Sequence, residues 1–346
     1  MTTLPDDLVL SWNSPTPKEP NLVSIALSDD ACPLPHAACE VTLHDGTTRD
    51  LSALEPNQLT ALQWEQERAF ARRILDAPKG SGQRADAIGR AYDTVTAIVG
   101  ARQAAASFRD DDEPVVMGMN RRYEQLVAKL LSGWRAQGVS PRFFEIGYGS
   151  GAFLHRIHQQ GYEVAGIEVS AAMRKQACRL FGPGHEDNLL LGDVLGWEPA
   201  ADRPRYHVAY WNDVFEHIPP DEIADCLRKI HDLLVPGGQL VTFTPNWHMR
   251  PWDITGDVCP PRTEAAGLHL KEYTLREVNR LLRETGFRHV ATPLFVTRRR
   301  CVMLGNGLAG VKRLFEPRLE RLPFPVAKLL CRGLGLSCTV ARKIAN

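Results

Sequence analysis

Hydrophobic residues in the second half of the chain fall in short runs separated by longer amphipathic stretches. The short runs are rich in Val, Leu, Ile and aromatic residues, which is typical of strands buried on both faces. They predict strands at residues 142–146, 163–168, 188–192, 206–211, 239–244, 288–294 and 301–304. The amphipathic stretches predict helices at residues 151–160, 171–180, 220–234 and 274–285.

Strands and helices that alternate in this way form a mostly parallel sheet covered on both faces. We therefore predict an α/β fold, with a Rossmann-like sheet of seven strands, for a domain at residues 116–305. Residues 1–115 are predicted to be a mainly helical extension or cap with short strands, including helices at residues 57–76 and 82–106. Residues 306–346 are predicted to be a basic, amphipathic helical tail.

Charge is balanced over the whole chain but not at its C-terminal end. The 41 Lys and Arg residues equal the 41 Asp and Glu residues, so no general attraction to nucleic acid is expected. Residues 298–346 hold eleven bases and only two acids, Glu316 and Glu320. Such a segment either docks on its own domain or makes a peripheral contact with a membrane surface. An oligomer is compatible with the sequence.

The eight cysteines are scattered and form no CxxC pair, which indicates free thiols in a reducing cytoplasm. The N-terminus lacks the long apolar core of a secretory signal, and no apolar run approaches the roughly 20 residues of a membrane span. The histidines are dispersed, and no His, Asp or Glu group has evident metal-ligand spacing. We therefore expect no metal site.

The sequence FFEIGYGSGAF, residues 143–153, places three glycines at every second position between a strand and a helix. Such a turn lies at the carboxyl end of the first strand of an open sheet, where ligands bind. Glycine lets the backbone approach a ligand without a Cβ atom in the way. Gly147, Gly149 and Ala152 also fit the dinucleotide fingerprint, with Glu168 as the acid about 20 residues further on.

Glu145 argues against a dinucleotide at this turn. The carboxylate stands two residues before the first glycine, and it would repel a pyrophosphate placed at the helix N-terminus. A ligand that carries positive charge, such as an amino group or a sulfonium, suits this position better.

The stretch EIGYGSG resembles motif I of the class I S-adenosylmethionine-dependent methyltransferases. The segments EVAGIEVS, LLLGDVLGW, YHVAYWNDVFEHIPP and LLVPGGQLVTFTPN resemble later parts of the same fold, and the resemblance covers about residues 120–295. Residues 244–287 resemble bacterial methyltransferases encoded among polysaccharide and natural-product genes. The ubiquinone-pathway O-methyltransferases are a more distant likeness.

The resemblance implies S-adenosylmethionine as the cofactor and S-adenosylhomocysteine as the product. It implies that Glu145 and the glycine loop hold the methionine end of the cofactor. The loop residues that correspond are Gly147, Tyr148, Gly149 and Gly151.

The same resemblance assigns the nucleoside end of the cofactor. Glu168, with Val169 beside it, would accept hydrogen bonds from the ribose hydroxyls. Asp193 would bind the adenine amino group, and Val194 would lie beside the ring. Asn212, at the end of the fourth strand, completes the implied cofactor-binding set.

Two histidines are candidate general bases for an acceptor hydroxyl, because imidazole accepts a proton near neutral pH. His217 follows the fourth strand, and His269 lies in a segment expected to cover the acceptor. A structural role for His217, holding its loop or lying over the cofactor, remains open.

We predict methyl transfer to a hydroxyl of a small molecule, a sugar or a natural product. A non-catalytic regulatory module that binds the cofactor is one alternative, and an NAD-type oxidoreductase is another. No nucleic-acid partner is expected, because the chain has no basic, aromatic-rich patch outside its C-terminal end.

Overall fold

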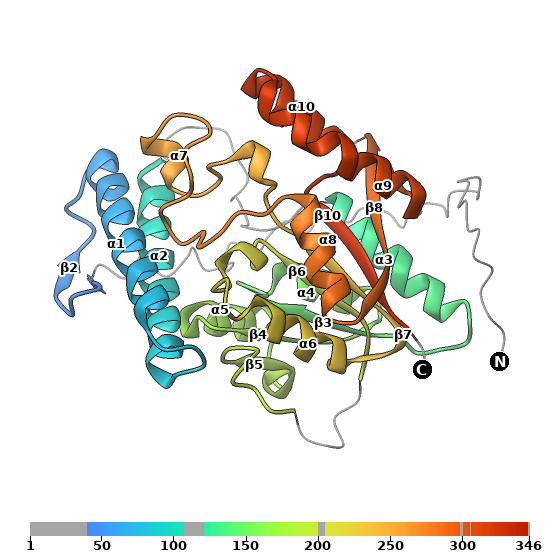
Figure 1. Cartoon of the computed structure of the whole chain (residues 1–346). Helices are drawn as coiled ribbons and strands as arrows, with labels where there is room; N and C mark the ends of the chain where they lie inside the picture. Colours follow the sequence, from blue (N-terminus) through green and yellow to red (C-terminus); the bar gives the residue numbers. More distant parts are fainter. Residues whose placement is uncertain (1–39, 107–120, 200–204, 298–299, 305, 345–346) are drawn as a thin grey trace.

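Figure 1 shows the computed structural model of the chain, which describes residues 40–106, 121–199, 205–297, 300–304 and 306–344. A central sheet has helices on both faces, and a pair of long helices lies beside it. Residues 1–39 and 107–115 of the predicted N-terminal extension lie outside the described residues.

The central sheet of the described chain has eight strands in the order β5-β4-β3-β6-β7-β10-β8-β9. The strands from β5 to β7 are parallel, β10 is antiparallel to both β7 and β8, and β9 is antiparallel to β8. Their bounds are β3 Arg142–Ile146, β4 Glu163–Glu168, β5 Leu189–Leu191, β6 Tyr206–Asn212, β7 Leu234–Phe243, β8 Phe287–Thr297, β9 Arg300–Leu304 and β10 Cys338–Lys343. The carboxyl ends of β3, β4 and β6 therefore meet at one edge of the sheet.

The predicted α/β, Rossmann-like fold is confirmed, but the predicted count of seven strands is wrong, because the sheet has eight. The strand that the sequence analysis missed is β10, which lies inside the segment predicted to be a helical tail. Its sequence CTVARK mixes small, polar and basic residues, so it lacks the apolar run that marks the buried strands. Pairing with β7 and β8 makes it a strand and buries Val340 and Ala341.

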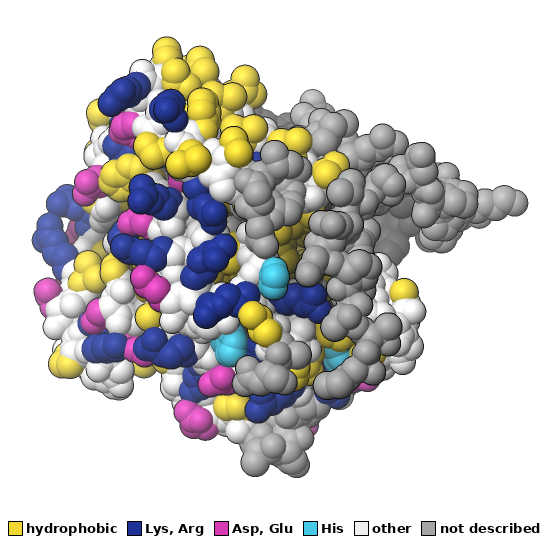
Figure 2. All heavy atoms as spheres, turned by 45° about the vertical axis from the view of Figure 1, so that its right-hand side comes forward, with side chains coloured by type: hydrophobic (Ala, Val, Ile, Leu, Met, Phe, Trp, Pro, Cys, Tyr) yellow, Lys and Arg dark blue, Asp and Glu magenta, His cyan; other side chains and the backbone are white. Residues whose placement is uncertain are grey.

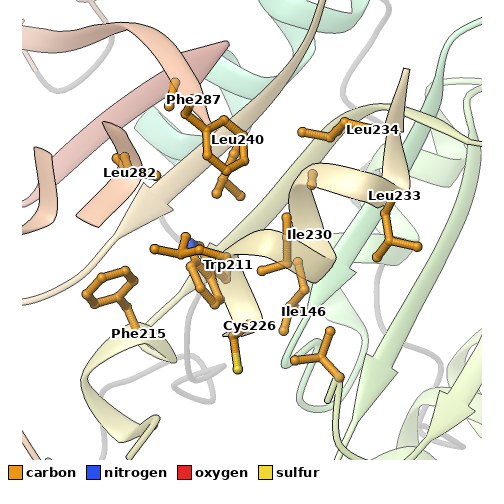
Figure 3. Close-up of a cluster of buried hydrophobic side chains, with 14 of the residues drawn as sticks. Ile146, Trp211, Phe215, Cys226, Ile230, Leu233, Leu234, Leu240, Leu282 and Phe287 are labelled. Carbon is orange, nitrogen blue, oxygen red and sulfur yellow. The ribbon is translucent and has the colours of Figure 1, made fainter. Parts of the chain in front are cut away.

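Alternate residues of each central strand enter two separate cores, because successive side chains of a strand point to opposite faces. Phe143 packs with α3 (Arg121–Arg135), α4 (Ala152–Gln159) and α5 (Ala171–Phe181). Phe144 belongs to the other core, with α6 (Ile223–Leu233) and α8 (Leu275–Glu284). Figure 3 shows part of this second core, where the sheet residue Trp211 faces Ile230 of α6. Every helix and strand predicted for the domain is present, with bounds that differ by a few residues.

The described part of the N-terminal extension folds as a short hairpin and two long helices. The hairpin pairs β1 (Glu40–Thr42) with β2 (Thr48–Asp50), and the helices are α1 (Pro56–Asp76) and α2 (Gly82–Ala106). Proline at the first helical position and a capping box between Glu55 and Gln58 fix the start of α1. The two helices pack against each other through a cluster that includes Leu59 and Ile98.

The C-terminal segment is folded onto the domain. It contains α9 (Asn306–Phe315), the 3-10 helix η4 (Glu316–Arg321) and α10 (Phe324–Gly333), followed by β10. The buried Glu316 carboxylate accepts hydrogen bonds from the backbone N–H of Leu275 at 2.6 Å and of Arg276 at 3.0 Å. An anion at a helix N-terminus is favourable, so Glu316 fastens this segment to α8. None of the described helices combines the length and the apolar character that a membrane span requires.

Candidate functional site

A cavity of about 450 Å³ lies at the carboxyl ends of β3, β4 and β6. This is the edge where ligands bind in open α/β sheets, and the volume is within the usual range for small-molecule sites, about 300–1,000 Å³. Nine of the ten residues implied to bind the cofactor line the cavity, and Gly151 is the exception. Both predicted catalytic histidines, His217 and His269, line it as well.

The three glycines of the loop all have left-handed φ angles, but they are needed for different reasons. Gly147 has a φ of 67°, and an added Cβ would lie 2.4 Å from a methyl group of Val214. Gly151 has a φ of 79°, and an added Cβ would lie 2.8 Å from the Cβ of Ala177. Gly149 has a φ of 55° and nothing within 4 Å of an added Cβ. The first two glycines therefore make room for the protein's own packing, and only Gly149 keeps its surface open toward a ligand.

Glu145 is a buried carboxyl group with spare hydrogen-bonding capacity. Burial, followed by the nearby charge of Glu168, raises its pKa well above the usual range, and the backbone N–H of Leu154 offsets this in part. Its Oε2 atom has no hydrogen-bond partner among the described residues. Leu154 is in the first turn of α4, where a dinucleotide would place its pyrophosphate. The carboxyl group of Glu145 thus stands where the pyrophosphate of a dinucleotide would bind, and it favours a cationic ligand there.

Glu168 ties together the two loops that border the cavity at β3 and β4. Its Oε2 accepts a hydrogen bond from the Gly149 N–H at 2.8 Å, and its Oε1 accepts one from the Ser170 N–H at 2.9 Å. Each carboxylate oxygen has two lone pairs, so both can still accept from ribose hydroxyls. Burial raises the pKa of Glu168, while the hydrogen bonds from Ser170 and Gly149 oppose that rise.

The remaining predicted cofactor residues differ in what they offer. Asp193 uses Oδ1 to accept a hydrogen bond from the Leu195 N–H at 3.1 Å, and burial raises its pKa. Val194 is buried and belongs to the core beside the cavity. The Tyr148 hydroxyl donates a hydrogen bond to the Leu190 carbonyl oxygen at 3.0 Å, so this side chain is held against β5. Val169 and Asn212 line the cavity.

Helices α1 and α2 of the N-terminal extension form the wall opposite the glycine loop. Their lining residues include Gln63, Glu67, Tyr92 and Arg102. The buried Glu67 accepts a hydrogen bond from Gln63 at 2.7 Å and another from the Leu268 N–H at 3.1 Å. Sequence patterns gave no sign of these residues, because the wall exists only where the extension packs over the domain.

His217 has its ring orientation fixed by the backbone. Its Nδ1 lies 2.8 Å from the Leu268 carbonyl oxygen, which can only accept, so Nδ1 carries the hydrogen and Nε2 has the lone pair. Burial, reinforced by the charge of His269, lowers the pKa of His217 to about 4. The imidazole is therefore neutral at pH 7 and carries a lone pair on Nε2, and its low pKa makes it a weak base in this environment.

His269 is held by a carboxylate on its own loop. Its Nδ1 lies 3.0 Å from Oε1 of Glu272, and the two imidazole rings of His217 and His269 are 4.6 Å apart. Burial would lower the pKa of His269, but the hydrogen bond to Glu272 and the charges of Asp213 and Glu272 outweigh it and raise that pKa.

Two carboxyl groups that the sequence analysis did not select complete the cluster. Asp213 turns the chain at the end of β6 with a left-handed φ of 59°, a conformation rare outside glycine and frequent at functional sites. Burial and the charge of Asp213 raise the pKa of Glu216 well above its usual range. Asp213 is exposed at its own position, and its proximity to Glu216 lowers its pKa. The two carboxyl groups therefore differ, with Glu216 the one that burial keeps from ionising readily.

The side chains of Asp213, Glu216, His217 and His269 offer ligand atoms that all lie within 4.8 Å of one another. The sequence analysis expected no such group. Three of the four residues stand at positions i, i+3 and i+4, which was the signal available in the sequence. The fourth comes from a loop about 50 residues away, and only the fold brings it in. This cluster could hold a proton, an acceptor hydroxyl or a divalent cation.

Comparison with known proteins agrees with this geometry. Residues 117–292, just over half of the chain, match the family described as a methyltransferase domain. An uncharacterized methyltransferase from Geobacillus kaustophilus is 36% identical over 98 residues. That match covers 28% of this chain and 43% of the relative, so the chain matches less than half of the length of this curated protein.

Solved structures share the fold at low identity. The CcbJ methyltransferase from Streptomyces caelestis is 16% identical, with 65% of this chain and 89% of that chain covered and a TM-score of 0.42. Magnesium protoporphyrin IX methyltransferase from Synechocystis is 17% identical, with 63% and 96% covered and a TM-score of 0.40. These likenesses are too weak to add to the family match.

The chain belongs to the methyltransferase domain family. Its sheet, glycine loop and acids at the ends of β3, β4 and β5 are those of a class I S-adenosylmethionine-dependent methyltransferase, and S-adenosylmethionine is the cofactor. The residues present fit this cofactor, since Gly149 leaves an open backbone surface and Glu145 offers a buried oxygen without a partner.

Proposed function

We propose that this enzyme transfers a methyl group from S-adenosylmethionine to a hydroxyl oxygen of a small, polar acceptor. The observation that carries the proposal is that one cavity joins the glycine loop to the cluster of His217 and His269. A bound cofactor supplies an electrophilic methyl group on a sulfonium. The protein must then hold an acceptor oxygen in line with it, exclude water and remove the hydroxyl proton.

For the cofactor half of the cavity we keep the arrangement implied by the sequence. We assign the methionine amino group to Glu145 and the open backbone at Gly149, where a positive charge compensates the buried carboxylate. Glu168 binds the ribose hydroxyls through its remaining lone pairs, and Asp193 binds the adenine amino group beside Val194. Asn212 borders the cofactor at the end of β6.

The acceptor half lies between this region and the helices of the extension. Its walls offer hydrogen-bonding groups on Gln63, Tyr92 and Arg102, together with the flat ring of Trp252. Such a mixture of polar and aromatic groups suits a hydroxylated ring, as in a sugar or an aromatic natural product. We therefore favour these acceptors over a nucleic acid.

His217 is our first choice for the general base. Its Nδ1–H is donated to Leu268, so the Nε2 lone pair is available to take the hydroxyl proton. His269, held by Glu272, lies beside it, with its Nε2 4.0 Å from Oε1 of Glu216. The carboxyl groups of Asp213 and Glu216 near these rings stabilise the positive charge that an imidazole gains when it takes the proton.

A divalent cation in the same cluster is a second way to activate the acceptor. Four ligand atoms within 4.8 Å of one another favour it, and Glu272 would orient His269 as metal-bound histidines require. Treatment with a chelator, followed by return of Mg²⁺, Mn²⁺ or Zn²⁺, separates the two mechanisms. Turnover that survives the chelator assigns the step to the imidazole alone.

A non-catalytic module that binds the cofactor remains the alternative function. An NAD-type oxidoreductase is disfavoured, since Glu145 occupies the helix N-terminus where a pyrophosphate would bind. We also place the enzyme in the cytoplasm. The free thiols of Cys178, Cys226 and Cys331 suit a reducing compartment.

The first test is calorimetric titration of the protein with S-adenosylhomocysteine, with NAD as the control. We expect micromolar binding of the first compound and none of the second. Methyl transfer from labelled S-adenosylmethionine is then assayed against hydroxylated sugars and phenols, each paired with its amino analogue. Binding without turnover of any acceptor would support the regulatory module, and preference for the amino analogues would overturn transfer to oxygen.

A further inference from the structure

The described C-terminal segment carries apolar side chains on its outer surface that no other described element covers. On α9, Val311 and Leu314 are 59% and 75% exposed, and Phe315 follows them on the same face. On α10, Val326 and Leu329 are 43% and 71% exposed and stand three positions apart. Spacings of three and four residues place these side chains on one stripe of each helix. Soluble surfaces seldom gather so many large apolar groups over one short segment.

The same segment is strongly basic on its outside. Between Asn306 and Gly333 the only acids are Glu316 and Glu320, and both are used internally. Glu316 is buried at the start of α8, and Glu320 pairs with Arg250 at 2.7 Å and with His248 at 2.9 Å. The exposed bases of this stretch therefore have no acidic neighbour within the segment. They are Arg318, Arg321 and Arg332, with Lys328 partly exposed.

An aromatic side chain connects this surface to the cavity. Trp252 lines the cavity and is 39% exposed. Lys328 Nζ lies 5.0 Å from its ring centre, and Arg332 Cζ lies 5.2 Å from it. Tryptophan and flanking bases are the side chains that anchor proteins at a membrane interface. The outer surface of α10 and the acceptor side of the cavity are therefore neighbours.

Figure 1 places α10 and α9 one after the other along the upper right edge of the molecule. In Figure 2 hydrophobic side chains gather at the top of the molecule, with Lys and Arg side chains beside and below them. Apolar side chains with Lys and Arg around them are typical of an amphipathic helix that lies in a lipid interface.

We propose that α9, η4 and α10 form a docking surface for an anionic lipid membrane. Leu314 and Leu329 enter the boundary of the acyl chains, and Arg318, Arg321, Lys328 and Arg332 bind the lipid phosphates. A second copy of the chain is the less suitable occupant, because an isologous contact would set these bases against one another. Docking in this way brings the mouth of the cavity at Trp252 to the lipid surface, where an acceptor attached to a lipid could enter.

Vesicle flotation of the full chain tests the proposal. Vesicles of phosphatidylcholine alone are compared with vesicles of equal parts phosphatidylcholine and phosphatidylglycerol. We expect flotation with the anionic vesicles, at least tenfold weaker partition to the neutral ones, and loss of binding as salt is raised. Equal partition to both kinds of vesicle, or none to the anionic kind, would overturn the proposal.

Two double variants and their matched controls locate the surface. L314E/L329E removes the apolar contact, and K328E/R332E reverses the charge; each should reduce partition to anionic vesicles by tenfold or more. L75E/L180E, at two other exposed leucines, and R72E/R73E, on α1, make the same chemical changes elsewhere and should leave partition unchanged. Thermal unfolding checks that all four proteins are folded.

The oligomeric state supplies a second readout. If the wild type is a dimer in light scattering and L314E/L329E is a monomer, the surface is an interface between two copies and the membrane proposal fails. Binding of S-adenosylhomocysteine is measured on the same samples. It should be equal in all variants, so failure of membrane docking is separable from failure of the proposed function.

Discussion

At the scale of single residues, the site contains polar groups that are buried away from water and lack a full set of hydrogen-bond partners. Glu145 and Glu216 are buried carboxyl groups whose pKa values are raised by that burial. Polar groups in this state destabilise the fold and are retained where a ligand or a reaction uses them. Glu168 differs, because its backbone hydrogen bonds give it a structural role beside its ligand role.

Glu168→Ala should weaken the binding of S-adenosylhomocysteine by about ten- to a hundredfold, since hydrogen bonds to a charged group contribute about 1.5–3 kcal/mol. Glu168→Gln keeps one acceptor oxygen, so its affinity for S-adenosylhomocysteine should fall between those of the wild type and the alanine variant. Calorimetric titration measures both, with thermal unfolding as the check on the fold. Unchanged affinity in the folded alanine variant would remove Glu168 from the cofactor site.

His217→Ala should lower kcat by about 10²–10⁴-fold, as expected for the loss of a general base. The affinity for S-adenosylhomocysteine should stay within twofold of the wild type, because the imidazole serves the acceptor. His158→Ala, in the last turn of α4, is the control and should change neither kcat nor the affinity for S-adenosylhomocysteine. A variant that loses affinity and turnover together would instead show that His217 lies over the cofactor.

At the scale of elements, the C-terminal segment stabilises the domain through two carboxylates. Glu316 accepts from the first amides of α8, and Glu320 joins η4 to the loop after β7 through Arg250 and His248. Both contacts join parts of the chain about 40 to 70 residues apart. The segment therefore belongs to the same cooperative unit as the sheet that its last strand completes.

The hydrogen bond with Arg250, together with that from His248, holds the pKa of Glu320 at about 2. A depressed carboxyl pKa contributes stability above the unfolded value, near 4.5, and this stability is lost as the pH falls toward 2. Glu320→Gln should therefore cost about 1 kcal/mol at pH 7 and progressively less below about pH 4.5. Urea unfolding of both proteins at several pH values measures the difference. A difference independent of pH would contradict this account.

At the scale of the whole molecule, the N-terminal extension and the methyltransferase domain together line the cavity in which we propose the acceptor site. Glu67 of α1 accepts from the Leu268 N–H, next to His269, and Leu268 in turn holds His217 through its carbonyl. The extension thus supports both histidines, and its helix α2 also contacts the segment after β4, where Asp93 accepts a hydrogen bond from the Ser170 hydroxyl at 2.6 Å. The position of the reacting groups depends on a contact about 200 residues apart in the sequence.

Glu67→Ala should therefore lower kcat/KM for the acceptor by about tenfold, since small displacements of positioned groups reduce rates strongly. The affinity for S-adenosylhomocysteine should not change. Glu65→Ala, at an exposed position on the same helix, is the matched control. If Glu67→Ala leaves turnover intact, the extension acts only as a stabilising cover.

Much of the fold could be predicted because its signals are local. The apolar runs that form β3, β4 and β6 are continuous in sequence. The glycines of the loop are required by the turn from β3 into α4, which is also a local feature. The spacing of Asp213, Glu216 and His217 was equally local. It was overlooked because His269, the fourth member of the cluster, lies about 50 residues further along the chain. Strand β10 was not predicted, since its mixed sequence CTVARK has no apolar run and acquires strand structure by pairing with β7 and β8.

The sequence by itself determined the class of sheet, the cofactor loop and the acids that follow the strands, because each depends on residues close together in the chain. Tertiary structure alone decided which glycine stays open to the cavity, how His217 and His269 are held and which helices line the wall beside them. Those properties depend on burial and on contacts between distant segments. Neither exists until α1, the loop around His269 and the C-terminal segment have packed against the sheet.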